Sequence, residues 1–225
     1  NSDTPDIAAM QALAHEFGAI LVVDVAHDLG CLGTDGTGHI GMQGMLGKVD
    51  LVMGSFSKTF GSNGGFVATN ERAVKEYLRF YSPSCTFSNA LSPIQVAVVS
   101  KALEIVASPE GALLRGQLMR NVLSLRQQIR DHGLDVYGDP SAIVAVQTGD
   151  EALARMMSRE LPALGLISNL VEFPAVAKGQ ARFRLQVMAG HTGEQLTAAA
   201  ERMAAAMTIA RRRLDAGFDK MELAL

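Results

Sequence analysis

Residues 50–69 read DLVMGSFSKTFGSNGGFVAT and contain two of the apolar runs from which the fold is predicted. It begins and ends with short, mostly apolar runs, Asp50–Ser55 and Gly64–Thr69. A similar run, AILVVD, occupies residues 19–24. Because these runs lack the polar–apolar alternation of a half-exposed strand, they predict strands buried on both faces, as in parallel sheets. Helical patterns alternate with them, so we expect an α/β fold with a mostly parallel sheet.

Helices are expected before and after these strands. Thr4 and Pro5 are typical of the N-cap and first residue of a helix, and Gly18 is typical of its stop. Asn70 predicts the cap of another helix. Residues 30–47 contain seven glycines, which predicts a long loop of the kind that often carries function. The expected helices cover residues 5–17, 71–81 and 90–107.

The pattern changes near Ser108, where a long amphipathic helix is expected to follow. The short link between two later strands, residues 174–180, predicts an antiparallel pair. We therefore expect two domains, an α/β domain over residues 1–108 and a small α+β domain over residues 109–225. The second domain is expected to hold helices over 111–133, 151–161 and 193–214, and strands over 142–147, 165–172 and 181–188.

Composition excludes several classes of protein. The chain has 225 residues, 48% of them hydrophobic, and a net charge of −3, without a basic run that would suggest nucleic-acid binding. No apolar run reaches the roughly 18 residues that span a bilayer. Two distant cysteines, Cys31 and Cys85, make neither a disulfide framework nor a cysteine zinc site. Without a disulfide framework, a reducing cytoplasm is the default location. The histidines lack metal-ligand spacing, so no metal is expected.

Three residues near predicted strand ends suggest cofactor chemistry. Ligands bind at the carboxyl ends of strands in α/β sheets, where Asp24, Ser55 and Lys58 are expected. A lysine flanked by hydroxyls and glycines should be partly desolvated, as a Schiff-base lysine must be. Pyridoxal phosphate also needs an aspartate at its pyridinium nitrogen and hydroxyl or backbone donors at its phosphate. The three residues together fit pyridoxal phosphate.

The same positions carry a resemblance to a known family. VDVAH at residues 23–27 and GSFSK at residues 54–58 resemble the paired motifs of the α-oxoamine synthases, which are fold-type I pyridoxal-phosphate enzymes. Residues 54–70, GSFSKTFGSNGGFVATN, look most like serine palmitoyltransferases. Residues 173–192, FPAVAKGQARFRLQVMAGHT, look more like 2-amino-3-ketobutyrate CoA ligase, or glycine C-acetyltransferase. The resemblance extends from residue 1 to about residue 214.

The resemblance implies a fold and a reaction. Residues 1–108 would be the C-terminal part of the cofactor-binding large domain, followed by the small α+β domain. The implied enzyme is an acyltransferase that condenses glycine, serine or alanine with an acyl-CoA or an acyl-carrier thioester. Loss of CO2 would leave an aminoketone. The implied assembly is a homodimer with the site at the subunit interface.

The resemblance also implies roles for residues of the N-terminal half. Lys58 would form the Schiff base with the cofactor and move a proton at the substrate Cα. Asp24 would keep the pyridinium nitrogen protonated, His27 would bond to the phenolic oxygen, and Ser55 would contact the phosphate. Ser88 would reach the phosphate held by the neighbouring subunit.

In the C-terminal half, the resemblance assigns the amino-acid carboxylate to Arg184, whose planar guanidinium suits a two-point grip. Arg182 points the same way along the predicted strand and is the residue most easily confused with it.

Two alternatives stay open. One is a class I/II aminotransferase on the same fold, which would share Asp24 and Lys58. The other is a non-catalytic fragment or subunit that needs an N-terminal partner, because the chain begins NSDTP without an initiator Met. The family's glycine-rich phosphate turn and ring-stacking residue would precede Asn1. One departure is Val25, where the family usually has an acidic residue.

Overall fold

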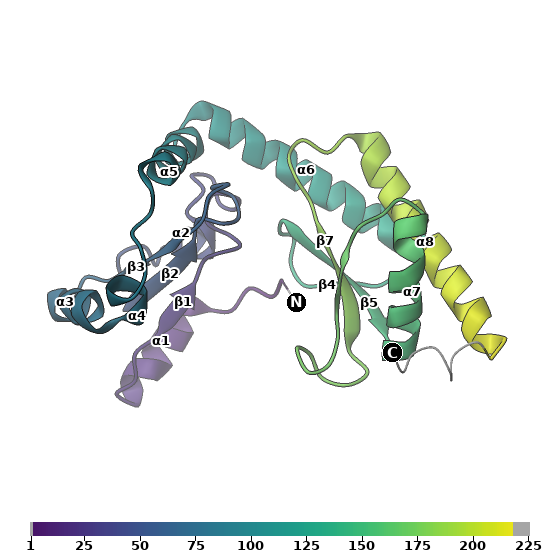
Figure 1. Cartoon of the computed structure of the whole chain (residues 1–225), viewed down its shortest axis with the longest axis horizontal. Coiled ribbons are helices and arrows are strands. Elements are labelled where there is room, and N and C mark those ends of the chain that lie inside the picture. Colours follow the sequence, from purple (N-terminus) through teal and green to yellow (C-terminus); the bar gives the residue numbers. More distant parts are fainter. Residues whose placement is uncertain (1, 218–225) are drawn as a thin grey trace. The chain divides into compact units, whose positions relative to one another are not determined.

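The structure is a computed structural model that describes residues 2–217, and it divides into two compact units (Figure 1). The N-terminal unit comprises Thr4–Gly116. The C-terminal unit comprises the described residues from Gln117 onward, together with Ser2 and Asp3. The division falls inside helix α6 (Pro109–Asp131), a little later than the boundary expected between residues 108 and 109. Residues 218–225 of the expected second domain lie outside the described residues.

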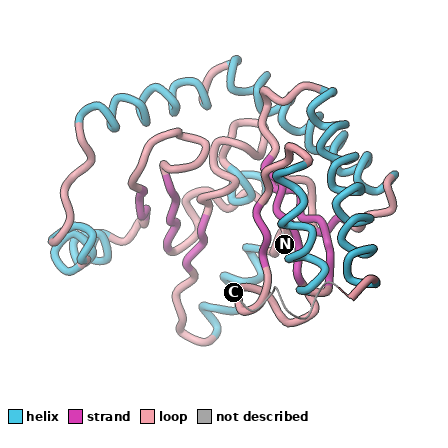
Figure 2. The backbone as a smooth tube through the Cα atoms, turned by 45° about the vertical axis from the view of Figure 1, so that its right-hand side comes forward, coloured by secondary structure: helices cyan, strands magenta, loops and turns pink. Residues whose placement is uncertain are grey.

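The N-terminal unit is built on a sheet of three strands among the described residues, β1 (Val22–Asp24), β2 (Leu51–Ser55) and β3 (Gly65–Ala68). Strand β2 lies in the middle, parallel to β1 and antiparallel to β3. Figure 2 shows the strands in magenta. The helices of this unit are α1 (Ile7–Glu16), α2 (Gly38–Met42), α3 (Arg72–Tyr81), α4 (Pro83–Thr86), α5 (Pro93–Val106) and the start of α6.

Two helix caps differ from the sequence prediction. Asp6 rather than Thr4 caps α1, because its carboxylate accepts a hydrogen bond of 2.9 Å from the Ala9 backbone N–H. Glu71 rather than Asn70 occupies the N-cap position of α3. The Asn70 side chain instead donates to the carbonyl of Gly47 at 2.7 Å. The predicted stop at Gly18 is confirmed by its positive φ of 64°.

The expectation that these strands are buried on both faces is wrong for the described chain. Val23, Val52 and Phe66 pack against the core cluster, which consists of Ile7, Val25, Ile40, Met45 and Val49. The alternate side chains face the opposite way and are exposed, to 54% at Val22, 41% at Met53 and 53% at Val67. Strand residues alternate between faces, and the described residues of this unit cover only one face of the sheet.

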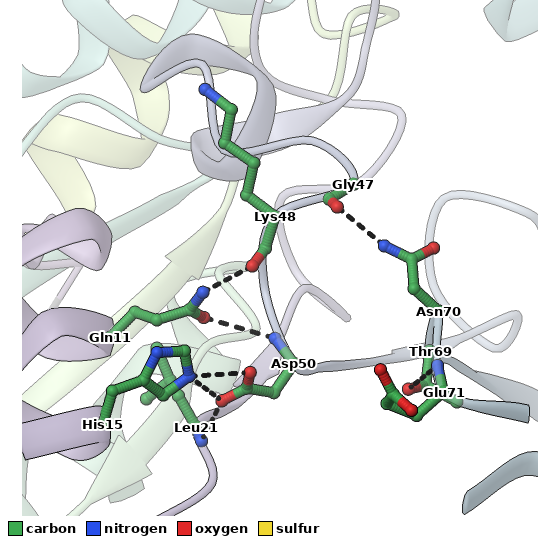
Figure 3. A network of polar contacts seen from close by, with 9 residues as sticks. All are labelled: Gln11, His15, Leu21, Gly47, Lys48, Asp50, Thr69, Asn70 and Glu71. Carbon is green, nitrogen blue, oxygen red and sulfur yellow. Dashed lines mark hydrogen bonds and ion pairs between the residues drawn. The ribbon is translucent and has the colours of Figure 1, made fainter. Parts of the chain in front are cut away.

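Polar contacts fix β1 beside the start of β2 (Figure 3). The Asp50 carboxylate accepts the Leu21 N–H at 2.9 Å and contacts His15 Nε2 at 2.9 Å. The Gln11 side chain donates to the Lys48 carbonyl and accepts the Asp50 N–H at 3.2 Å. Helix α1 and strand β1 are therefore both tied to the segment that opens β2.

The C-terminal unit contains an antiparallel sheet in the order β4-β5-β7-β6 among the described residues. The antiparallel pairing of β6 with β7 confirms the pair predicted from the short link, whereas β4 was not predicted. Phe183, Met157 and Met203 are fully buried in its core. The elements are β4 (Val136–Tyr137), β5 (Ile143–Gly149), α7 (Glu151–Ala163), β6 (Asn169–Val171), β7 (Ala181–Gln186) and α8 (Gly193–Asp215).

Across the described residues, none of the helices has both the length and the apolar character needed to cross a membrane.

We predict that Asp50→Asn destabilises the N-terminal unit by about 1 kcal/mol at neutral pH, the scale of a partly exposed charged hydrogen bond. The Leu21 N–H and then His15 hold the pKa of Asp50 below its usual value. A lowered folded-state pKa stabilises the fold above the unfolded pKa of about 3.9, and this stability is lost as pH falls through the folded pKa. Thermal unfolding of the variant should therefore depend less on pH in the acid range. The exposed Glu16→Gln is the control, and an unchanged acid profile for Asp50→Asn would contradict the prediction.

Candidate active site at the ends of two parallel strands

The parallel pairing of β1 with β2 brings two predicted motifs to one edge of the sheet. Asp24 is the last residue of β1 and pairs with Met53, two residues before Ser55 at the end of β2. The Val25 N–H continues the ladder by donating to the Met53 carbonyl at 2.8 Å. The segments that follow β1 and β2 therefore leave the sheet at the same edge, where α/β proteins bind ligands.

The turn after β1 places Asp24 and His27 on its outer side. The Asp24 carboxylate accepts the Ala26 N–H at 2.8 Å, and both Asp24 and His27 are exposed. Val25 and Ala26 are buried and anchor the turn. The structure thus presents the two predicted cofactor-binding residues from a turn that is held by its own core residues.

Lys58 lies on a loop that is fixed on both sides. On one side, the Ser55 hydroxyl accepts the Ser57 N–H at 3.1 Å and contacts the Ser57 hydroxyl at 2.7 Å. On the other side, Phe60 is 2% exposed, and its ring meets the Phe56 ring edge-on at 5.6 Å. Lys58 itself is exposed, so the predicted partial desolvation is not found in the described chain. The backbone of this loop is therefore held in place on both sides of Lys58, while the Lys58 side chain is accessible to solvent.

Gly54 is the first residue of the GSFSK motif, and the space around it has no room for a side chain. It is buried in β2, and a Cβ there would lie 2.5 Å from Cε1 of Phe66 and 3.3 Å from Cγ2 of Val25. Any larger residue would displace the Phe66 ring or the strand. The glycine therefore lets β2 pack closely just before Ser55 and Lys58.

A half-buried carboxylate, Asp28, follows this turn and was not among the site residues predicted from the sequence. Asp28 accepts the His39 N–H at 2.8 Å. Burial raises the pKa of Asp28, and the bond from His39 opposes that shift. The contact ties the turn after β1 to the glycine-rich loop, and only the position of Asp28 just after VDVAH could have suggested it.

Ser88 does not lie at the strand ends. It is exposed between α4 and α5, next to Phe87, whose side chain is 92% exposed.

In the C-terminal unit, Arg184 is half-buried on β7 and lines a hollow of about 580 Å³. Its cross-strand partners are Ala145 on β5 and Asn169 on β6. The hydroxyl oxygen of Ser168, which also lines the hollow, is buried without a hydrogen-bond partner among the described residues. The hollow therefore combines a guanidinium with amide and hydroxyl groups, a set suited to a carboxylate.

Arg182 has different surroundings from Arg184. It is 6% exposed, its guanidinium lies 4.7 Å from the Tyr137 ring centre, and its Nε donates to the Gln180 carbonyl at 2.9 Å. These contacts give Arg182 a role in packing. Of the two arginines, Arg184 is the one that lines the hollow.

Comparison with known proteins places the chain in a family. Residues 2–203 match the model of aminotransferase class I and II. The chain is 37% identical over 190 residues to 2-amino-3-ketobutyrate coenzyme A ligase of Escherichia coli (strain K12), with 84% of this chain and 47% of that protein covered. It is 35% identical over 201 residues to serine palmitoyltransferase of Sphingobacterium spiritivorum, with 89% and 50% covered.

Solved structures agree with these relatives. Serine palmitoyltransferase of Sphingomonas wittichii matches with a TM-score of 0.83 at 30% identity, over 93% of this chain and 52% of that chain. A high-resolution structure of SPT with PLP matches with a TM-score of 0.82 at 31% identity, over 92% and 52%. These matches confirm the resemblance to α-oxoamine synthases and the fold-type I architecture.

The chain spans about half the length of the curated relatives it matches. Because the family model matches residues 2–203 of this chain, the chain belongs to the aminotransferase class I and II family.

Proposed function

We propose that this chain carries the cofactor-binding and substrate-carboxylate residues of a pyridoxal-phosphate-dependent α-oxoamine synthase. The reaction joins glycine, serine or alanine to an acyl-CoA or acyl-carrier thioester, and it releases CO2 and the thiol to leave an aminoketone. The observation that carries the proposal is the shared edge of β1 and β2, where Asp24, His27, Ser55 and Lys58 leave the sheet together.

The residues at this edge suit the cofactor. Lys58 offers an accessible amine on a loop whose neighbours Ser57 and Phe60 are held in place. Asp24 offers an exposed carboxylate fixed by the Ala26 N–H. Pyridoxal phosphate supplies an electron sink that stabilises negative charge at the substrate Cα when it is bound.

Each residue has a separate task in the proposal. The Lys58 amine binds the cofactor's aldehyde carbon and moves the proton at the substrate Cα. The Asp24 carboxylate keeps a proton on the ring nitrogen, and His27 donates a hydrogen bond to the phenolic oxygen. The Ser55 hydroxyl donates to the phosphate, and its contact with Ser57 orients it.

Arg184 is proposed to bind the carboxylate of the amino acid. A guanidinium presents parallel N–H donors to both carboxylate oxygens, which sets the direction of the substrate as well as its affinity. Asn169 and Ser168 border the same hollow and add polar groups beside the guanidinium.

We also propose that the enzyme is a cytoplasmic homodimer. The support is the exposed apolar surface around Ser88, since Phe87 is 92% exposed and Ile94 is 78% exposed. Large exposed apolar side chains are typical of interaction sites. In a dimer, Ser88 would reach the phosphate bound by the partner subunit.

The reaction class is tested by thiol release. The chain with pyridoxal phosphate, glycine or serine, and acetyl-CoA should release free CoA, and Lys58→Ala should lower the rate on the order of 10²-fold or more, because general acid–base transfer is lost. Lys101→Ala is the control for an exposed lysine outside the site. Amine exchange with a 2-oxo acid without CoA release would instead identify an aminotransferase. If the chain shows neither CoA release nor amine exchange, the proposed function is refuted for this chain.

Arg184→Lys should raise the KM for the amino acid about tenfold, equivalent to roughly 1.4 kcal/mol, because an ammonium cannot make the two-point grip. The KM for the acyl donor should stay the same. Arg212→Lys, at the exposed end of α8, is the matched control. An unchanged KM for the amino acid in Arg184→Lys would rule out this role.

If the protein is a dimer, analytical ultracentrifugation of the unaltered protein should give the sedimentation coefficient of two chains. Phe87→Ser should lower the sedimentation coefficient to that of one chain. A single-chain particle for the unaltered protein would remove the role proposed for Ser88.

A further inference from the structure

A contact directly after Lys58 links the two strand-end motifs. The Cys31 Sγ and the Thr59 Oγ1 lie 2.8 Å apart, within hydrogen-bond distance. Cys31 belongs to the loop that follows the Asp24–His27 turn, and Thr59 is the next residue after Lys58. The contact therefore spans the space between the segment that presents Asp24 and the segment that presents Lys58.

Steric packing reinforces this contact. Gly30 has a φ of +83°, and a Cβ there would lie 2.8 Å from Cγ2 of Thr59 and 3.3 Å from Cγ2 of Val106. The Thr59 methyl thus rests directly on the backbone of residue 30, while its hydroxyl meets the neighbouring thiol. A threonine offers both groups from one Cβ, whereas serine or valine offers only one of them.

The Gly30–Cys31 segment is itself backed by other parts of the N-terminal unit. The Gly30 N–H donates to the Gly36 carbonyl at 2.6 Å. The Arg115 guanidinium donates to the Val106 carbonyl at 2.8 Å and to the Thr34 carbonyl at 2.7 Å. The glycine-rich loop is therefore held at several points and can serve as a fixed support for Thr59.

The chemistry of Cys31 suits a structural donor. Burial raises the pKa of the Cys31 thiol, so the thiol keeps its proton at neutral pH. A protonated thiol can donate to the Thr59 hydroxyl oxygen, and the Thr59 hydroxyl can equally donate to the sulfur.

We infer that Thr59, held by Cys31 and Gly30, is a positioning residue that fixes the Lys58 backbone relative to the Asp24–His27 turn. The inference rests on the proposed function, because it assumes that Lys58 reacts with the cofactor. Lys58 is exposed, so its neighbours rather than burial must set its place. Effective covalent attachment requires the amine to be held near the position that Asp24 sets for the ring, and small misplacements are costly.

The test is the rate at which Lys58 captures pyridoxal phosphate. The amine adds to the aldehyde carbon and loses water, and borohydride then delivers hydride to leave a stable pyridoxyl-lysine. Peptide mapping after brief reduction gives the Lys58 rate, and adducts at Lys48 and Lys101 in the same map report general lysine reactivity. Thr59→Val and Cys31→Ala should each lower only the Lys58 rate, by about three- to tenfold, the scale of one hydrogen bond.

A double variant distinguishes loss of the Cys31–Thr59 contact from a general disturbance of the fold. Because both changes remove the same contact, the double variant Cys31→Ala/Thr59→Val should be no slower than either single variant. Thr59→Ser keeps the hydroxyl and should restore most of the Lys58 rate. Cys85→Ala and Thr34→Val, at exposed positions, are matched controls. A normal Lys58 rate in Thr59→Val, or losses that add in the double variant, would overturn the inference.

A second measurement does not depend on the cofactor. The Gly61 N–H donates to the Lys58 carbonyl at 3.0 Å, and the Ser62 N–H donates to the Phe56 carbonyl at 2.9 Å. Hydrogen exchange of residues 56–62 should be faster in Thr59→Val than in Thr34→Val. If the unaltered chain forms no Lys58 adduct, the proposed function fails and exchange alone decides the inference. Equal exchange in the two variants would then refute it.

Discussion

The parallel pairing of β1 with β2 determines where every proposed cofactor residue of the N-terminal unit lies, apart from Ser88. Its register places Asp24 beside Met53 and so brings both motifs to the same sheet edge. Asp50 holds the other end of the pair by accepting the Leu21 N–H and contacting His15. A slip of one residue would turn Asp24 to the opposite face of the sheet and separate it from the Lys58 loop.

The resulting site combines a rigid backbone with accessible side chains. Buried Val25 and Phe60 anchor the two loops, while Asp24 and Lys58 point outward. This is the arrangement that a covalently bound cofactor requires, since its attachment point must be both reachable and fixed. Arg184, for which we propose the substrate-carboxylate role, lies on a different sheet in the C-terminal unit.

Local sequence patterns predicted every strand of the described chain except β4, because strand patterns depend on near neighbours in the chain. They did not predict the cap of α1, since Thr4 and Asp6 are both suitable caps. The choice depends on Ile7, which is 2% exposed and whose N–H donates to the distant Gln43 side chain at 2.8 Å. The exposure of Lys58 depends on what packs over its loop, and the Cys31–Thr59 contact joins residues 28 positions apart. No local pattern encodes either feature.

Lys58 is tested as the attachment point by titrating the chain with pyridoxal 5′-phosphate and following the visible absorbance. We expect a saturable Schiff-base band that is present in the unaltered protein and in Lys48→Ala and is absent in Lys58→Ala. An equally strong band in Lys58→Ala would contradict the role of Lys58, because the cofactor would then be held by a different lysine. Absence of any band in the unaltered protein would contradict it as well.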